Sequence, residues 1–306
     1  MTHSPSKRGP AVVLLTGASS GIGLALTKKL SHPAFTTHYL TIATARPASL
    51  ENLNQPDIRE SPHVHVRPLD VTESSQREDA VHQIERDFGP VDILINNAGI
   101  SYRSVVEHMT EEDQWLQFKT NLFGPAHLMR LVLPAMRERG KGHIINVSSV
   151  GGMMAMPTMG EYSASKFALE GLSEALYYEM KPWKVHVTLF QPGFVYSQSF
   201  KKVLLSKAAQ AAVNTGDTYA NYYHYMSRFI EKLMGQALAT PESLADRILK
   251  LMAHPHPPLR APASADARLF ALMTRLLPRR AYHALLYRSL PGIKHWRSEI
   301  PPDSDT

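Results

Sequence analysis

The amino-acid sequence predicts a doubly wound α/β fold, in which one parallel sheet carries helices on both faces. Short apolar runs alternate with helical segments along the chain, and the first run, at 11–15, passes directly into the glycine-rich loop Thr16-Gly-Ala-Ser-Ser-Gly-Ile-Gly23. Alternation favours parallel pairing, because each helix crosses over between two strands. The 306 residues, 43% hydrophobic and 20% charged, suffice for one large core without a second domain.

Six apolar runs are predicted to be strands, and two long segments to be helices. The strands are expected at 11–15, 39–43, 64–69, 91–95, 142–147 and 185–190. The first long helix is expected to open at Thr110, with Asp113 three positions on, and to run to about Arg139. The second is expected at 160–181.

The glycine-rich loop stands between a strand and a helix, as in a dinucleotide-binding turn. Gly17 permits a tight turn, Gly21 lets the backbone approach a pyrophosphate, and Gly23 lets the following helix pack closely on the strand. The loop residues predicted to bind a cofactor are Gly17, Ser19, Ser20, Gly21, Ile22 and Gly23.

Three side chains have the spacing of a proton-transfer site: Ser149, Tyr162 thirteen positions later, and Lys166 four further on. Tyr162 and Lys166 share one face if the segment after Met159 is helical. A tyrosine hydroxyl titrates near pH ~10, so a neighbouring ammonium is needed to favour the phenolate at neutral pH. Ser149 is then placed to hold a substrate oxygen while Tyr162 gives or takes the proton.

Together with Asn96-Asn-Ala-Gly99, these motifs resemble the short-chain dehydrogenases/reductases, over residues from about 11 to about 253. Segments 147–157 and 162–171 look similar to the branch that holds estradiol 17-beta dehydrogenase and photoreceptor retinol dehydrogenases. The resemblance implies a Rossmann-type fold and hydride transfer between a nicotinamide cofactor and a carbonyl or alcohol. It implies that Lys166 lowers the pKa of Tyr162 and binds the nicotinamide ribose, and that Asn121 completes the proton relay.

The cofactor is predicted to be NADP(H). The second predicted strand ends in Ala43-Thr-Ala-Arg46, without the carboxylate that would accept the ribose hydroxyls of NAD, and the Arg46 guanidinium suits a 2′-phosphate. The alternative is a solvated loop arginine. The resemblance adds further cofactor-binding positions: Asp70, Val71, Asn97, Ala98, Gly99, Pro192, Gly193, Val195 and Ser197. Ser197 stands where the family commonly carries threonine, and we expect its hydroxyl contact to persist.

The substrate is expected to be hydrophobic: a steroid, a retinoid or a long-chain aliphatic compound. Methionines cluster between Ser149 and Tyr162, and tyrosines between residues 219 and 225, and such side chains form adaptable apolar surfaces. The alternative is that they pack a lid onto the domain. The candidate substrate residues are Val150, Met156, Met159, Phe194 and Tyr222.

The C-terminal stretch is strongly basic. Residues 260–297 hold eight Arg and Lys against Asp266 alone, and leucines recur there at helical spacing on either side of Pro278. Two basic amphipathic helices are predicted, which either dock on an anionic membrane surface through 266–297 or pack on the substrate lid or a second subunit. No nucleic-acid module is recognised, so no nucleic-acid partner is expected.

We therefore expect a polar tail at 1–10, a dinucleotide-binding catalytic domain at 11–258 with a substrate lid at about 194–238, and a basic extension at 259–306. No apolar run approaches the roughly 18 residues of a membrane span, so a cytoplasmic protein is expected, with peripheral membrane contact possible through the extension. A homodimer or homotetramer is implied by the resemblance. The histidines are scattered and cysteine is absent, so no metal site is predicted.

Two other functions fit the same fold. A non-catalytic NADP(H)-binding regulator or scaffold would not need Tyr162 beside Ser149, and both are present. A dehydratase or epimerase usually carries a shorter Gly-x-x-Gly-x-x-Gly loop and a longer C-terminal substrate domain. An oxidoreductase that interconverts a carbonyl and an alcohol is therefore the primary prediction.

Overall fold

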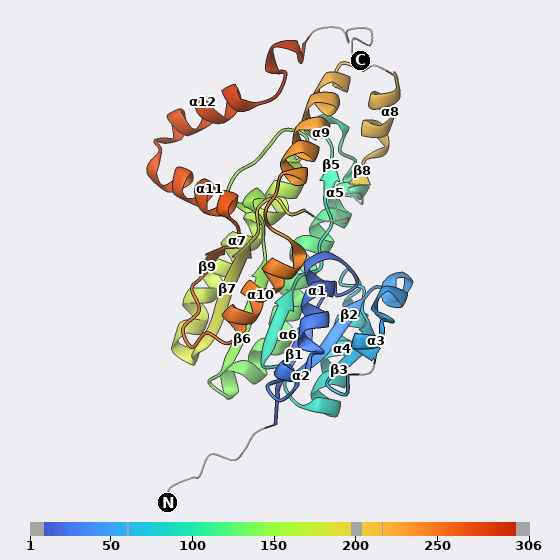
Figure 1. Cartoon of the computed structure of the whole chain (residues 1–306), viewed down its shortest axis with the longest axis vertical. Coiled ribbons are helices and arrows are strands. Elements are labelled where there is room, and N and C mark those ends of the chain that lie inside the picture. Colours follow the sequence, from blue (N-terminus) through green and yellow to red (C-terminus); the bar gives the residue numbers. More distant parts are fainter. Residues whose placement is uncertain (1–8, 60, 197–203, 216, 298–306) are drawn as a thin grey trace, which may run out of the picture.

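The computed structural model describes residues 9–59, 61–196, 204–215 and 217–297. Its centre is a seven-stranded parallel sheet in the order β3-β2-β1-β4-β6-β7-β9 (Figure 1). The strands are β1 (Ala11–Leu15), β2 (Tyr39–Ala45), β3 (Val64–Pro68), β4 (Ile93–Asn96), β6 (Gly142–Val147), β7 (Val185–Gln191) and β9 (Arg260–Pro262). The predicted doubly wound fold is confirmed, and all six predicted strands are present.

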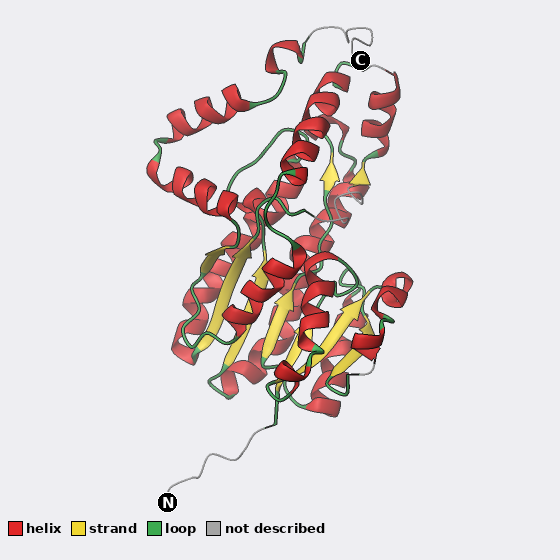
Figure 2. Cartoon of the chain, in the orientation of Figure 1, coloured by secondary structure: helices red, strands yellow, loops and turns green. Residues whose placement is uncertain are grey.

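Helices cover both faces of this sheet, as Figure 2 shows. Alternate residues of β1 point to opposite sides, so that Val13 and Leu15 enter one hydrophobic core while Val12 and Leu14 enter the other. The first core is closed by α1 (Gly21–Leu30) and α10 (Pro241–Met252). The second is closed by α4 (Ser74–Phe88), α6 (Gly124–Glu138) and α7 (Gly160–Met180).

The first predicted long helix is present but interrupted. α5 (Glu111–Phe118) begins at Thr110, whose hydroxyl accepts from the Asp113 backbone N–H at 3.1 Å. The chain then passes through the π-helical turn η3 (Lys119–Phe123) before it continues as α6. A π-turn inserts one extra residue per turn, and such turns occur frequently at functional sites. Asn121 lies in this turn.

β9 is the one strand of the sheet that the sequence did not predict. It has three residues, is partly exposed, and pairs with β7 through Leu189 and Arg260. A short edge strand with a proline lacks the apolar run by which strands are recognised. As a result, the first residues of the predicted extension lie in the sheet.

Beyond the carboxyl ends of the strands, smaller elements extend the molecule (Figure 1). Strands β5 (Tyr102–Arg103) and β8 (Leu204–Leu205) pair there, next to α8 (Lys207–Thr215) and α9 (Ala220–Gly235). α11 (Ala265–Leu276) and α12 (Arg279–Ser289) occupy the two C-terminal leucine-rich stretches and are separated at Pro278. Within the described residues, no helix is long and apolar enough to cross a membrane.

The remaining short helical elements connect these parts. They are α2 (Pro33–Thr36), η1 (Pro47–Leu53), α3 (Pro56–Arg59), η2 (Val106–His108), η4 (Val150–Gly152), η5 (Lys181–Trp183) and η7 (Ile293–His295).

Candidate active site

The glycine-rich loop adopts a backbone that only glycine accommodates easily. Gly17 has φ +66° and Gly21 has φ +52°, both in the left-handed region. A Cβ added to Gly17 would lie 2.7 Å from the Ala98 Cα, and one added to Gly23 would lie 2.2 Å from the Gly17 carbonyl oxygen. The loop is therefore packed tightly between the start of α1 and the chain that follows β4.

Asn97 and Thr16 fix this loop from the side. The Asn97 Nδ2 donates to the carbonyl oxygens of Thr16 and Gly17, each at 3.0 Å. In return, the Thr16 hydroxyl oxygen accepts from the backbone N–H groups of Asn97 and Ala98 at 3.0 and 3.1 Å. The Asn97 amide therefore orders the loop. Thr16 was not among the predicted residues, although its place at the end of the first strand is a usable signal.

The first turn of α1 is available to an anion. Its N-cap residue Ser20 is extended, and in the described part of the chain its side chain makes no capping hydrogen bond. The amino end of a helix carries free N–H groups and a partial positive charge, so it suits the pyrophosphate of a dinucleotide. The predicted loop residues thus form a site that fits such a cofactor.

Arg46 and Asp70 lie at the same edge of the sheet. Parallel pairing of β2 with β3 sets Ala45 beside Pro68, so the chain leaves both strands side by side. The Arg46 side chain is exposed, whereas one oxygen of the Asp70 carboxylate accepts from the Thr72 N–H and hydroxyl at 2.9 and 2.8 Å. The neighbouring residue, Val71, is buried in the second core.

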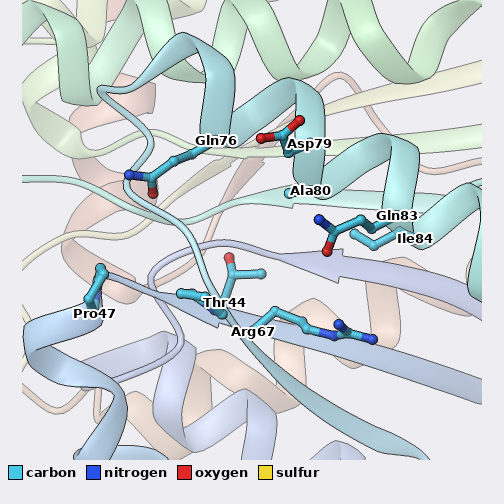
Figure 3. A pocket seen from close by; sticks show the side chains of 9 residues that line it. Thr44, Pro47, Arg67, Gln76, Asp79, Ala80, Gln83 and Ile84 are labelled. Atoms are coloured by element: carbon cyan, nitrogen blue, oxygen red, sulfur yellow. The ribbon is translucent and has the colours of Figure 1, made fainter.

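A cavity of about 430 Å³ lies beside this edge, between β2, β3 and α4 (Figure 3). Thr44 and Arg67 approach it from the strands, and Gln76 and Gln83 from α4. Gln76 also accepts from the Asp70 backbone N–H at 2.8 Å. The cavity therefore adjoins the edge of the sheet that carries Arg46 and Asp70, and no residue near Ser149 lines it.

Ser149 and Tyr162 meet around Gly151. Ser149 begins η4, and its Oγ accepts from the Gly151 N–H at 3.0 Å. A Cβ on Gly151 would lie 2.8 Å from the Tyr162 Cε1 and 3.5 Å from the Ser149 Oγ. Because Tyr162 lies in the first turn of α7, the loop after β6 and the start of α7 bring the two hydroxyl-bearing side chains together.

Lys166 lies one turn further along α7 and is only 5% exposed. Its Nζ donates to the Val147 carbonyl oxygen at 2.8 Å and lies 5.9 Å from the centre of the Tyr162 ring. Burial lowers the pKa of Lys166 to about 8, and the nearby Glu170 carboxylate opposes this shift. The ammonium is therefore held in the core with a backbone carbonyl as partner.

The pKa of Tyr162 differs from the expectation. Burial raises the pKa of the Tyr162 hydroxyl, and the Ser149 hydroxyl lowers it by less. The Lys166 ammonium, which was expected to lower the pKa of Tyr162, is engaged by Val147. In this arrangement Tyr162 is protonated at neutral pH, as a tyrosine with an ordinary pKa also is.

Asn121 ties the π-turn to the site. Its Oδ1 accepts from the Ile100 N–H at 2.9 Å, while its Nδ2 donates to the Ile100 carbonyl at 3.0 Å and to the Ser165 hydroxyl at 3.1 Å. A Cβ at Gly99 would have both the Asn121 Oδ1 and the Lys166 Nζ within 4 Å. The structure thus places both Asn121 and Lys166 close to Gly99.

Glu170 is a buried carboxylate that the sequence analysis missed. It accepts from the Ser148 hydroxyl at 2.7 Å and from the Gln191 Nε2 at 2.8 Å, and its other oxygen lies 3.6 Å from the Arg260 Nε. Glu170 follows Lys166 by four positions, so both lie on one face of α7. That spacing was a usable signal, but the partners from β7 and β9 were not visible in the sequence.

The turn after β7 is held from two directions. The Pro192 carbonyl accepts from the Val150 N–H at 2.8 Å. On its other side, the Gly193 N–H donates to the Ser264 Oγ at 3.0 Å and the Phe194 N–H donates to the Asp266 Oδ2 at 2.7 Å. The first turn of α11 therefore fixes the turn that contains the predicted cofactor-binding residues Pro192 and Gly193. Val195 bridges to Ala239, and the predicted Ser197 lies outside the described residues.

Three of the predicted substrate residues share one apolar cluster. Met156, Met159 and Tyr222 pack there with the buried Trp296, whose ring centre is 4.4 Å from that of Tyr222. Phe194 instead lies in the turn after β7, and Val150 lies in η4, where its N–H contacts that turn through the Pro192 carbonyl. Trp296 was not predicted, because nothing in the sequence around it indicates a contact with α9.

Comparison with known proteins gives one consistent relationship. Residues 11–208 match the short chain dehydrogenase family. The chain is 36% identical to a 3-ketodihydrosphingosine reductase of Bacteroides thetaiotaomicron, over 88% of this chain and 94% of that enzyme. It is 33% identical to human 17-beta-hydroxysteroid dehydrogenase type 1, over 81% of this chain and 76% of that enzyme.

Retinol dehydrogenase 8 of Bos taurus is 31% identical to the chain and is covered over 91% of both proteins. A solved structure of a short-chain dehydrogenase from Streptomyces avermitilis superposes with a TM-score of 0.74 at 31% identity, over 91% of this chain and 96% of that one. Both similarities extend well beyond the glycine-rich loop and include the Ser149 to Lys166 region.

Proposed function

Because the chain belongs to the short-chain dehydrogenase family, in the branch of retinol dehydrogenase 8 and 17-beta-hydroxysteroid dehydrogenase type 1, we propose that it is an NADP(H)-dependent oxidoreductase. It interconverts a carbonyl and an alcohol on a hydrophobic substrate. The observation that carries the proposal is the meeting of the Ser149 and Tyr162 side chains around Gly151, with Lys166 one helical turn away.

Tyr162 is the proton donor for carbonyl reduction. The hydride comes from the reduced nicotinamide of the bound cofactor. Ser149 hydrogen-bonds the substrate oxygen, and Tyr162, which is protonated at neutral pH, delivers a proton to that oxygen as negative charge develops on it. The Lys166 ammonium supplies positive charge beside the tyrosine, and Asn121 holds the π-turn against the Ile100 backbone. We assign Ser149, Tyr162, Lys166 and Asn121 as the catalytic group.

Arg46 supports NADP(H) over NAD(H) as the cofactor. It is exposed directly after β2, where the chain lacks the carboxylate typical of NAD-binding members. A guanidinium forms two parallel hydrogen bonds to a phosphate, so it favours the cofactor with the 2′-phosphate. The amino end of α1 would hold the pyrophosphate of such a cofactor, and the turn at 192–194 would hold its nicotinamide.

The cluster of Met156, Met159, Tyr222 and Trp296 supports a hydrophobic substrate. Methionine and aromatic side chains form a soft apolar surface that accepts bulky hydrocarbon groups. The names of the three relatives refer to a sphingoid ketone, a retinol and a hydroxysteroid, all of which are lipids. A steroid, a retinoid or a long-chain aliphatic compound fits this surface. We also propose that the enzyme is cytoplasmic.

α5 and α7 support a homodimer or homotetramer. Large hydrophobic side chains are exposed along these two helices and the π-turn between α5 and α6, including Trp115, Phe123, Phe167, Leu172 and Tyr178. Exposed apolar patches of this kind mark protein–protein contacts.

The test is NADPH oxidation by the purified protein with a keto-sphingoid base, a retinal and a steroid ketone. Wild type should turn over at least one of them, and Tyr162→Phe should lose roughly a hundredfold or more in turnover, the scale for removing a general acid. Tyr287→Phe, at an exposed tyrosine of α12 outside the catalytic group, is the control. NADPH binding without turnover of any of the three would instead support a non-catalytic NADP(H)-binding protein.

A further inference from the structure

α11 turns an apolar stripe away from the protein. Leu269, Leu272 and Leu276 are 55%, 53% and 66% exposed, whereas Ala267 on the same helix is completely buried. At about 100° per residue, these leucines lie on the side of the helix opposite Ala267. The helix therefore packs on the domain through one face and leaves its most hydrophobic face in solvent.

Positive charge surrounds this stripe. The segment 265–297, here called the basic arm, carries seven exposed basic side chains: Arg268, Arg275, Arg279, Arg280, Arg288, Lys294 and Arg297. Asp266 is its only acidic residue, and that carboxylate accepts from the Phe194 N–H. Leu285 and Tyr287 of α12 are also exposed. The free surface of the arm is thus cationic and apolar at once.

The basic arm is anchored at both ends. Next to its start, Ser264 and Asp266 bind the turn at 192–194. Near its end, Trp296 is buried against Tyr222, and the His295 carbonyl accepts from the Asn221 Nδ2 at 3.0 Å. Figure 1 shows α11 and α12 standing out from the sheet domain between these two anchors. The outward face is therefore held in a defined orientation.

We propose that the outward face of α11 docks on an anionic lipid surface. Leucines at the boundary between headgroups and acyl chains, flanked by arginines that reach the lipid phosphates, are the pattern of a helix lying in a membrane interface. Anionic lipid complements the seven basic side chains, and each contributes to the attraction. The same face of a second copy would bring like charges together, and a nucleic acid would leave the exposed leucines without a partner.

Vesicle co-sedimentation of the full chain tests this inference without depending on activity. Binding is expected to vesicles of phosphatidylcholine with phosphatidylserine and not to phosphatidylcholine alone. It should fall with salt, because the Debye length shrinks from ~10 Å at 0.1 M to ~3 Å at 1 M ionic strength. Arg268→Ala and Arg275→Ala should each weaken binding about fivefold.

The apolar contribution is tested by Leu272→Asp/Leu276→Asp, which should reduce binding at least roughly tenfold. Leu238→Asp, the same change at a leucine that is 92% exposed outside the arm, and Arg86→Ala on α4 are the matched controls and should bind like wild type. Both leucines are solvent-exposed, so the double variant should keep the wild-type melting temperature.

Three outcomes would overturn the proposal. They are the absence of binding to acidic vesicles, unchanged binding by Leu272→Asp/Leu276→Asp, and a change in the oligomeric state of that variant in sedimentation velocity without vesicles. The last outcome would assign the stripe to a subunit contact. None of them bears on turnover of a soluble ketone, so the proposed oxidoreductase function stands or falls separately.

Discussion

The buried Lys166 ammonium leads to a prediction about stability. A charged side chain that is 5% exposed loses most of its hydration, and its hydrogen bond to the Val147 carbonyl replaces only part of it. We therefore expect Lys166→Met, which keeps the chain length and removes the charge, to be more stable than wild type at neutral pH. A group to which we assign a role in catalysis would then destabilise the fold.

The magnitude follows from the pKa of Lys166. Lowering this pKa from its ordinary value of 10.5 to about 8 corresponds to a cost of about 3 kcal/mol in the folded state. The methionine leaves the Val147 carbonyl without its hydrogen-bond donor, and this loss destabilises the variant by about 1 kcal/mol. The expected gain in the free energy of unfolding at pH 7 is therefore about 2 kcal/mol.

The pH dependence has a definite sign. Below pH ~8 the lysine is charged in both the folded and unfolded states, so the full free-energy cost of burying its charge is present. Above the lowered pKa of about 8, the folded protein releases the proton while the unfolded chain keeps it up to 10.5, so the stability of wild type rises with pH in this window. Above this pKa, the difference in the free energy of unfolding between variant and wild type should shrink by ~1.4 kcal/mol per pH unit and nearly vanish by about pH 9.5.

Urea unfolding of both proteins at several pH values, without added cofactor, measures this difference. Comparing the two curves cancels the contributions of other titrating groups. Lys250→Met, at an exposed lysine in the last turn of α10, should show no such pH dependence. A Lys166→Met protein that was less stable than wild type at pH 7, or a gap that did not change with pH, would refute the account based on burial.

Three further predictions concern the cofactor and the catalytic group. Arg46→Ala should weaken NADPH binding roughly tenfold or more and NADH binding little, since only NADPH carries the 2′-phosphate; equal losses in parallel titrations would contradict this. Gly151→Ala would place a Cβ 2.8 Å from the Tyr162 ring, so turnover should fall about a hundredfold while the melting temperature stays within a few degrees. Asp266→Ala removes the acceptor of the Phe194 N–H, and the KM for NADPH should rise roughly tenfold with a smaller change in kcat; an unchanged KM would show that this contact does not position the turn.

Most of the fold could be predicted from local pattern. Strands buried on both faces read as continuous apolar runs, and the glycine-rich loop marked the first crossover unambiguously. β9 could not be found in this way, because its three residues become a strand only by pairing with β7. The hydrogen bonds that stabilise the π-turn could not be found locally either, because they join Asn121 to the Ile100 backbone, which is distant in sequence.

The spacing of Ser149, Tyr162 and Lys166 predicted that these side chains lie together, whereas the contacts that hold them in place depend on the tertiary structure. The separation of Tyr162 and Lys166 by one helical turn can be read from the sequence. The engagement of Lys166 by the Val147 carbonyl cannot, because it depends on how α7 packs against the sheet near the end of β6. For the same reason the raised pKa of Tyr162 was not foreseen: proximity to a lysine can be read from spacing, but burial cannot.

The basic arm was predicted either to dock on a membrane surface or to pack on the protein, and its two faces allow both. Its inward contacts belong to the site: Asp266 holds the turn at 192–194, and Trp296 joins the cluster of Met156 and Tyr222. Its outward leucines take no part in these contacts, because they lie on the side of α11 opposite the buried Ala267. Removing the whole arm would therefore damage the site whether or not the arm binds lipid. Only substitutions on the outward face separate the two roles, and they should leave catalysis intact.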